Sequence, residues 1–151
     1  MFKILVVEDD KELNRTVCSF LNHSGYEATG CLNATEAYDA LAENLFDCIV
    51  SDIMMPGVDG FEFAGNVREL NEDIPILFMT ARDDIASKQR GFRIGVDDYM
   101  VKPIDLDELF LLFPNQVLLT YHVILHLSSL SQSKYLDFLH LQNDNHKLRY
   151  Q

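Results

Sequence analysis

Four short apolar runs in this chain are each followed directly by charged or polar residues. In a parallel α/β sheet such runs are the buried strands, and their carboxyl ends open onto one crevice. The side chains that follow the runs should therefore converge on one site, and they are Glu8, Asp9, Asp52, Thr80 and Lys102. Three carboxylates, a hydroxyl and an ammonium suit a Mg²⁺-dependent phosphoryl site in which one aspartate is the acceptor.

The segments between these runs show the apolar spacing of helices. Five strands are expected, at residues 4–7, 26–32, 48–52, 75–79 and 98–101. Helices should alternate with them, including one capped by Asn33, one over 83–94 and one that begins near Asp105. In the third helix the inward set is expected to be Phe61, Ala64, Val67 and Leu70. This alternation predicts an α/β fold with a doubly wound, five-stranded parallel sheet.

Length and charge narrow the classes of function. The 151 residues suit one compact domain with an appendage, and a hydrophobic content of 48% suffices for a core. The formal net charge of −12 argues against nucleic-acid binding by this chain. No apolar run approaches the roughly 20 residues of a membrane span, so no membrane association is expected. Three cysteines without metal-ligand spacing predict reduced thiols in the cytoplasm.

Longer motifs surround the polar positions and follow one another in a fixed order. They are Val6-Val7-Glu8-Asp9-Asp10, Ser51-Asp52-Ile53-Met54-Met55-Pro56-Gly57-Val58-Asp59-Gly60, Thr80-Ala81 and Val101-Lys102-Pro103. Together they resemble the receiver domain of two-component response regulators, over residues 1–112. The resemblance implies a flavodoxin-like sheet with strand order 2-1-3-4-5. Asp97-Asp98-Tyr99 resembles the subgroup whose receivers precede a winged-helix DNA-binding domain.

The resemblance also implies a role for each acidic residue. Asp52 would be the phosphoacceptor for a sensor histidine kinase. Mg²⁺ would be held by Asp9, Asp52 and the backbone carbonyl of Met54, with Glu8 contributing through a water. The chain would then be a regulatory phosphoacceptor that assists its own phosphorylation and dephosphorylation, rather than an enzyme.

The chemistry of phosphoryl transfer supports these roles. A carboxylate is a weak nucleophile, so transfer to it depends on positioning and charge neutralisation. Lys102 would give a point positive charge to one phosphate oxygen, and Thr80 a hydrogen-bond donor to another. Pro103 after Lys102 indicates a constrained turn compatible with a cis bond. The family position of Tyr99 is a rotating switch aromatic, although its place alone also fits a half-buried strand aromatic. A helix cap fits Asp10 better than Asp9.

Two other functional classes share part of this pattern. An aspartate-nucleophile phosphatase of the haloacid dehalogenase type needs a second aspartate two residues after the nucleophile, where Met54 stands. A flavodoxin-like cofactor binder needs a phosphate-cradling loop after the first strand, where Glu8, Asp9 and Asp10 would repel a flavin phosphate. The sequence therefore favours the receiver.

Residues 113–151 form an atypical tail with few acids and no consistent apolar period, which predicts an irregular C-terminal extension. A winged-helix domain needs about 100 residues, so neither an effector output nor DNA binding is expected of this chain. Two origins stay open: translation from a shifted reading frame, or a short natural extension that packs on the receiver. A homodimer is expected through the tail, or through the face from the fourth to the fifth helix. That face would pair Lys88, Arg90 and Arg93 with Asp97, Asp98, Asp107 and Glu108 of a second chain.

Overall fold

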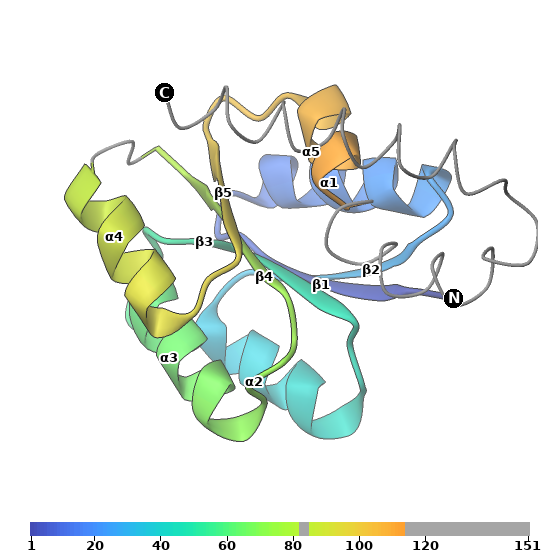
Figure 1. The fold of residues 1–151 in the computed structure, drawn as a ribbon. Coiled ribbons are helices and arrows are strands. Elements are labelled where there is room, and N and C mark those ends of the chain that lie inside the picture. Colours follow the sequence, from blue (N-terminus) through green and yellow to red (C-terminus); the bar gives the residue numbers. More distant parts are fainter. Residues whose placement is uncertain (82–84, 114–151) are drawn as a thin grey trace, which may run out of the picture. The chain divides into compact units, whose positions relative to one another are not determined.

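A five-stranded parallel sheet organises the described part of the chain (Figure 1). The computed structural model describes residues 1–81 and 85–113. The strands lie in the order β2-β1-β3-β4-β5, and every neighbouring pair is parallel. They are β1 (Lys3–Val7), β2 (Glu27–Cys31), β3 (Cys48–Asp52), β4 (Ile76–Thr80) and β5 (Asp98–Val101). The doubly wound sheet and its strand order are confirmed.

Helices follow the strands and cover both faces of the sheet. They are α1 (Lys11–His23), α2 (Ala34–Glu43), α3 (Gly60–Leu70), α4 (Ile85–Ile94) and α5 (Leu106–Phe113). Figure 1 shows α1 and α5 on one face, and α2, α3 and α4 on the other. The chain divides into a unit of residues 1–110 and a second unit that begins at Leu111. The predicted tail, residues 113–151, lies almost entirely outside the described residues.

Short polar side chains start the first three helices. Asp10 accepts hydrogen bonds from the backbone N–H groups of Glu12 and Leu13, both at 3.0 Å, and so caps α1. Asn33 caps α2 by accepting from the Glu36 N–H at 2.9 Å, as its sequence position predicted. Asp59 caps α3 in the same way, through the N–H of the residue three positions on. These caps fix where each helix leaves the loop at the carboxyl end of its strand.

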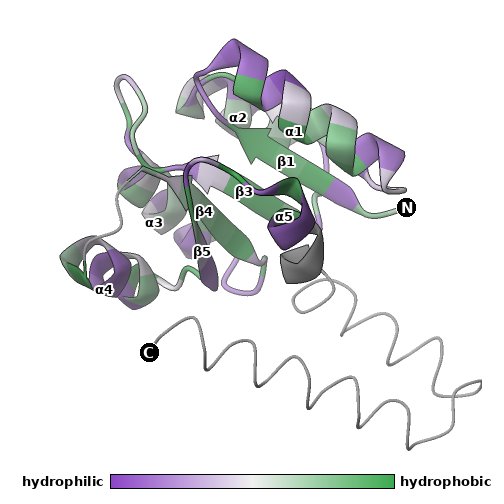
Figure 2. Ribbon diagram, turned by 90° about the horizontal axis from the view of Figure 1, so that it is seen from above, coloured by the Kyte–Doolittle hydropathy of each residue, from purple (hydrophilic) through white to green (hydrophobic). Residues whose placement is uncertain are grey.

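The central strands are buried on both faces, as expected for a parallel sheet covered by helices on both sides. Figure 2 shows β1, β3 and β4 as largely hydrophobic, and every residue of β3 and β4 is buried. One prediction for α3 is wrong: Leu70 is 84% exposed, whereas Phe63 is completely buried. The buried face of α3 runs through Gly60, Phe63, Ala64 and Val67. Its next position in a 3.6-residue repeat is Asn71, where the helix ends, so Leu70 turns away from the sheet.

Candidate functional site

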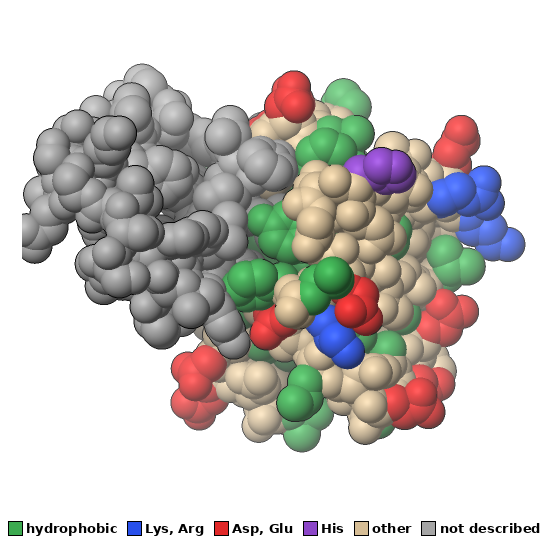
Figure 3. Space-filling view, turned by 90° about the vertical axis from the view of Figure 1, so that its right-hand side faces the viewer, with side chains coloured by type: hydrophobic (Ala, Val, Ile, Leu, Met, Phe, Trp, Pro, Cys, Tyr) green, Lys and Arg blue, Asp and Glu red, His purple; other side chains and the backbone are tan. Residues whose placement is uncertain are grey.

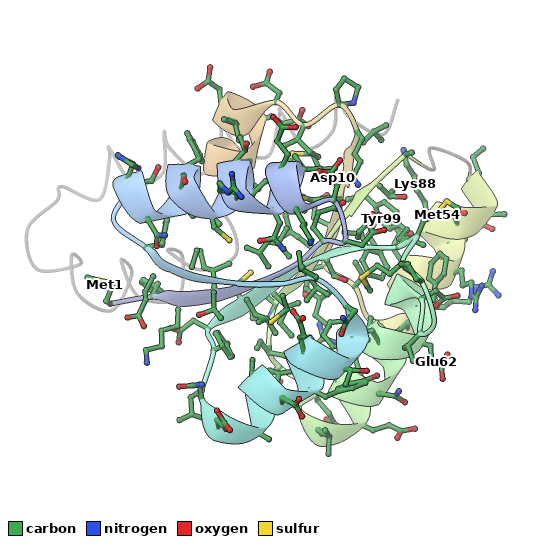
Figure 4. The ribbon with its side chains drawn as sticks, turned by 180° about the vertical axis from the view of Figure 1, so that it is seen from behind. Met1, Asp10, Met54, Glu62, Lys88 and Tyr99 are labelled. Atoms are coloured by element: carbon green, nitrogen blue, oxygen red, sulfur yellow. The ribbon has the colours of Figure 1, made fainter. Side chains whose placement is uncertain are left out.

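The polar residues predicted to converge lie at the carboxyl ends of the strands. Glu8 and Asp9 follow β1, Asp52 ends β3, Thr80 ends β4 and Lys102 follows β5. Figure 4 labels Asp10, Met54, Tyr99 and Lys88 toward this end of the sheet, and Met1 at the opposite end. Carboxyl ends of neighbouring parallel strands share one edge of the sheet, which is why residues far apart in sequence gather here.

Lys102 forms the centre of the charged contacts at this edge. Its Nζ donates to both carboxylate oxygens of Glu8, at 3.0 and 2.9 Å, and to Oδ2 of Asp52 at 2.9 Å. The backbone N–H of Lys102 donates to the carbonyl of Thr80 at 2.8 Å, which attaches this segment to the end of β4. The peptide bond between Lys102 and Pro103 is cis, as the sequence suggested. One ammonium therefore bridges two carboxylates that come from different strands.

The charges at this site do not balance. Glu8 is completely buried and Asp52 is only 4% exposed, so two carboxylates face one ammonium away from bulk water. Burial raises the pKa of Glu8 to about 7, opposed by its hydrogen bond from Lys102 and reinforced by the charge of Asp52. Burial alone would lower the pKa of Lys102, but its hydrogen bonds with Glu8 and Asp52 outweigh this and raise it. An additional cation would relieve the excess negative charge.

The acidic residues offer the donors that such a cation needs. Oxygen atoms of Glu8, Asp9 and Asp52 all lie within 4.8 Å of one another, and the Asp9 side chain is exposed. Mg²⁺ prefers hard oxygen ligands and usually takes one or two carboxylates while keeping several waters. The donor set therefore fits Mg²⁺. The Met54 N–H donates to Oδ1 of Asp52 at 3.2 Å, so the β3–α3 loop also orients this carboxylate.

Gly60 and Asp10 both act on the backbone next to the acidic residues. A Cβ at Gly60 would overlap with the Asp52 carbonyl, so only glycine lets the start of α3 lie this close to β3. Asp10 caps α1 rather than contributing to the acidic cluster.

Asn14, on α1, is buried and was not predicted as a site residue. Its side-chain amide donates to the Glu8 carbonyl at 3.0 Å and to the Cys31 carbonyl at 2.9 Å. Gly30 leaves room for that amide.

The two predicted switch residues are both buried. Thr80 is the last residue of β4, and Tyr99 lies on β5. The Tyr99 hydroxyl donates to the Ser87 carbonyl of α4 at 2.6 Å. Its ring packs edge-on against Phe78 of β4, with the ring centroids 5.4 Å apart, and against Phe92 of α4 at 5.7 Å. Tyr99 is therefore a buried anchor for α4 rather than a half-buried strand residue.

Two of the acids predicted to form ion pairs with a second chain, Asp97 and Asp98, have contacts within their own chain. Asp98 is 2% exposed and its Oδ1 accepts from the Tyr99 N–H at 2.8 Å, so its assignment to an intermolecular ion pair is wrong. Asp97 is already paired with Arg68 of the same chain, at 3.0 Å, and accepts from the Ile76 N–H at 2.8 Å. Asp97 thereby links Arg68 of α3 to the start of β4 within one chain. The sequence could not show this, because the ion pair joins residues that are 29 positions apart.

Comparison with known proteins identifies the family and the fold. A family model described as the response regulator receiver domain matches residues 4–113. The chain belongs to this receiver domain family. The receiver assignment replaces the phosphatase and flavodoxin-like alternatives, and places the chain among the proteins of two-component signalling.

Relatives of this receiver are named response regulators. Response regulator MprA of Mycobacterium sp. (strain KMS) is 39% identical over 107 residues, which cover 71% of this chain and 46% of that protein. The transcriptional regulatory protein PcoR of Escherichia coli is 36% identical over 109 residues, which cover 72% of this chain and 48% of that protein. The chain thus spans about half the length of the curated relatives it matches.

Solved structures share the receiver fold. Chemotaxis protein CheY4 of Vibrio cholerae superposes with a TM-score of 0.74 at 31% identity, covering 77% of this chain and 98% of that one. Response regulator TrrA of Thermotoga maritima, solved in complex with Mg²⁺ and BeF, has a TM-score of 0.66 at 33% identity, covering 72% of this chain and 93% of that one. Among residues 1–81 and 85–113 of the receiver, no helix has the length and apolar character to cross a bilayer.

Proposed function

We propose that this receiver is a phosphoaspartate signalling switch in which Asp52 accepts a phosphoryl group from a sensor histidine kinase in a Mg²⁺-dependent reaction. The observation that carries the proposal is the setting of Asp52. Its carboxylate is almost completely buried, contacts the Lys102 ammonium at 2.9 Å, and lies beside the carboxylates of Glu8 and Asp9. An isolated surface aspartate has no such set of charges around it.

The proposed step forms a bond between one Asp52 carboxylate oxygen and phosphorus while the phosphorus–nitrogen bond of the kinase phosphohistidine breaks. The freed imidazole nitrogen then takes a proton. Lys102, already directed at Oδ2 of Asp52, neutralises part of the negative charge on the transferred oxygens, and the Thr80 hydroxyl donates to another of them. Mg²⁺ held by Asp9, Asp52 and the Met54 carbonyl, with Glu8 acting through a water, would supply the remaining positive charge. The chain would assist its own phosphorylation and dephosphorylation without being an enzyme.

The switch that reads this phosphorylation is proposed to be the pair Thr80 and Tyr99. A phosphoryl group on Asp52 adds anionic oxygens that attract donors such as the Thr80 hydroxyl. Movement of Thr80 toward the site would change the space beside the Tyr99 ring, which is already buried in this structure. Because Tyr99 bonds the Ser87 carbonyl and packs against Phe92, a change in its position changes the face of α4. The output is therefore a change of surface at α4 and β5.

The wider assignments follow from this proposal. We infer a cytoplasmic receiver over residues 1–112 and an atypical tail over 113–151, of natural or frameshifted origin. A homodimer would use the tail or the α4-to-α5 face, where Lys88, Arg90 and Arg93 remain candidates to meet Asp107 and Glu108 of a second chain. Exposed ion pairs of this kind contribute about 0–1 kcal/mol each. Figure 3 shows acidic side chains spread widely over one face of the molecule.

The test is phosphate incorporation by the full chain with a radiolabelled small phosphodonor and Mg²⁺. Asp52→Asn keeps the size and hydrogen-bonding ability of the side chain but removes the nucleophilic carboxylate, so acid-labile label should disappear. Asp59→Asn is the matched control, because asparagine still caps α3 and this residue lies in the loop after the same strand. The control should label like the wild type. Label that survives in Asp52→Asn would exclude Asp52 as the acceptor.

A further inference from the structure

Asn14 is a buried amide that joins the ends of two strands. It is the fourth residue of α1 and is 6% exposed. Its Nδ2 donates to the Glu8 carbonyl at 3.0 Å and to the Cys31 carbonyl at 2.9 Å. The Glu8 N–H also donates to the Cys31 carbonyl, at 3.0 Å. One side chain of α1 thus holds the segment after β1 against the end of β2.

The Glu8 carbonyl belongs to the peptide unit that joins Glu8 to Asp9. Peptide units are planar, so a hydrogen bond to this carbonyl restricts the orientation of the whole unit. The backbone on either side of it carries the two acidic side chains that, with Asp52, form the oxygen cluster. The Asp10 N–H donates to Oε1 of Glu8 at 3.2 Å and adds a second restraint on the same segment. The direction from which both carboxylates approach Asp52 therefore depends on this peptide unit.

Gly30 of β2 leaves the space that Asn14 occupies. A Cβ at this position would overlap with Oδ1 of Asn14 and would lie 3.2 Å from Sγ of Cys18. Asparagine at position 14 does not favour stability by itself, since it is a weaker helix former than leucine and a buried amide must keep its hydrogen bonds. An apolar side chain would satisfy the packing of α1 on the sheet. The two hydrogen bonds to the Glu8 and Cys31 carbonyls therefore explain why an amide stands at position 14.

We propose that Asn14 is a positioning residue for the metal site, which fixes the peptide unit between Glu8 and Asp9 and so aims both carboxylates at the ion. The inference rests on the proposed Mg²⁺ dependence of this receiver. Outer partners that orient metal ligands typically change metal affinity by about 10–100-fold when they are removed. Asn14 would belong to that class, acting through the backbone instead of through a ligand side chain.

The experiment is calorimetric titration of the full chain with MgCl₂, without phosphodonor. Asn14→Ala should weaken Mg²⁺ binding by at least about tenfold. Asn22→Ala is the matched control: it removes a side-chain amide of the same helix that also bonds the β2 backbone, at the Ala28 N–H, but far from the acidic residues in sequence. The control should keep the wild-type affinity. An unchanged affinity in Asn14→Ala, or an equal loss in Asn22→Ala, would overturn the proposal.

Gly30→Ala tests the same inference while leaving the Asn14 amide intact. The added methyl group should displace Asn14 and weaken Mg²⁺ binding, and combining it with Asn14→Ala should cause no further loss, because both changes act through one contact. Wild-type affinity in Gly30→Ala would contradict the proposal even if Asn14→Ala failed to fold. Where Asn14→Ala folds, additive losses in the double variant would contradict it as well. Failure of the wild-type chain to bind Mg²⁺ would refute the proposed metal dependence itself. Wild-type binding with unchanged variants would refute only the role of Asn14.

Discussion

Glu8 gives the sharpest test of the electrostatics at this site. Together with Asp52 it places two buried carboxylates on one Lys102 ammonium. Burial raises the pKa of Glu8 from 4.5 to about 7. Folding therefore favours the protonated form of this side chain. We predict that Glu8→Gln, which removes the charge but keeps the shape, stabilises the metal-free protein at neutral and alkaline pH.

The sign and size of the effect follow from proton linkage. Between pH 4.5 and about 7 the folded protein keeps a proton on Glu8 that the unfolded chain has released. The free energy of unfolding should therefore fall as the pH rises through this interval, and this contribution should be lost above it. At about 1.4 kcal/mol per pKa unit, the shift corresponds to about 3 kcal/mol. Between pH 5 and pH 8, the stability of Glu8→Gln relative to wild type should rise by about 2–3 kcal/mol.

The assay is urea unfolding followed by circular dichroism, in the presence of EDTA, at a series of pH values. The quantity that matters is the free energy of unfolding of the variant minus that of the wild type, because contributions of the titrating groups that do not interact with Glu8 then cancel. Glu62→Gln, on the exposed surface of α3, supplies the baseline for losing a surface carboxylate. A Glu8→Gln difference that stays constant from pH 5 to pH 8 would refute the argument that Glu8 is destabilised by burial.

Three further predictions concern the metal, the switch and the packing of α3. Asp9→Ala should weaken Mg²⁺ binding while keeping or raising the metal-free melting temperature, because it relieves carboxylate repulsion; equal Mg²⁺-induced melting shifts in both proteins would contradict this. Thr80→Ala should accept phosphate without the change at Tyr99 that NMR detects in the wild type, and an equal change in both would place the coupling elsewhere. Gly60→Ala should cost about 1–3 kcal/mol in urea unfolding, since its Cβ overlaps with backbone, whereas Gly65→Ala, with open space, should not destabilise.

Much of the fold and site could be predicted from the sequence because the signals are local. An apolar run followed by a polar residue marks a strand and its carboxyl end, and parallel strands bring those ends together whatever the details of packing. Glu8, Asp9, Asp52, Thr80 and Lys102 could be assigned to one edge of the sheet on this basis alone. Helix caps such as Asn33 are local as well, because the side chain bonds an N–H three residues away.

What only the tertiary structure decided depends on contacts between distant residues. Leu70 fits a helical repeat but is exposed at the last position of α3. Asn14 looks like an ordinary polar position of α1 until β2 passes beside it, and its bond to the Cys31 carbonyl spans 17 positions. Asp98 looks like a surface acid until packing buries it. Periodicity shows which side of an element meets the core, but the partner of a buried polar group is fixed only when the elements pack, because an unpaired one would cost about 1–3 kcal/mol.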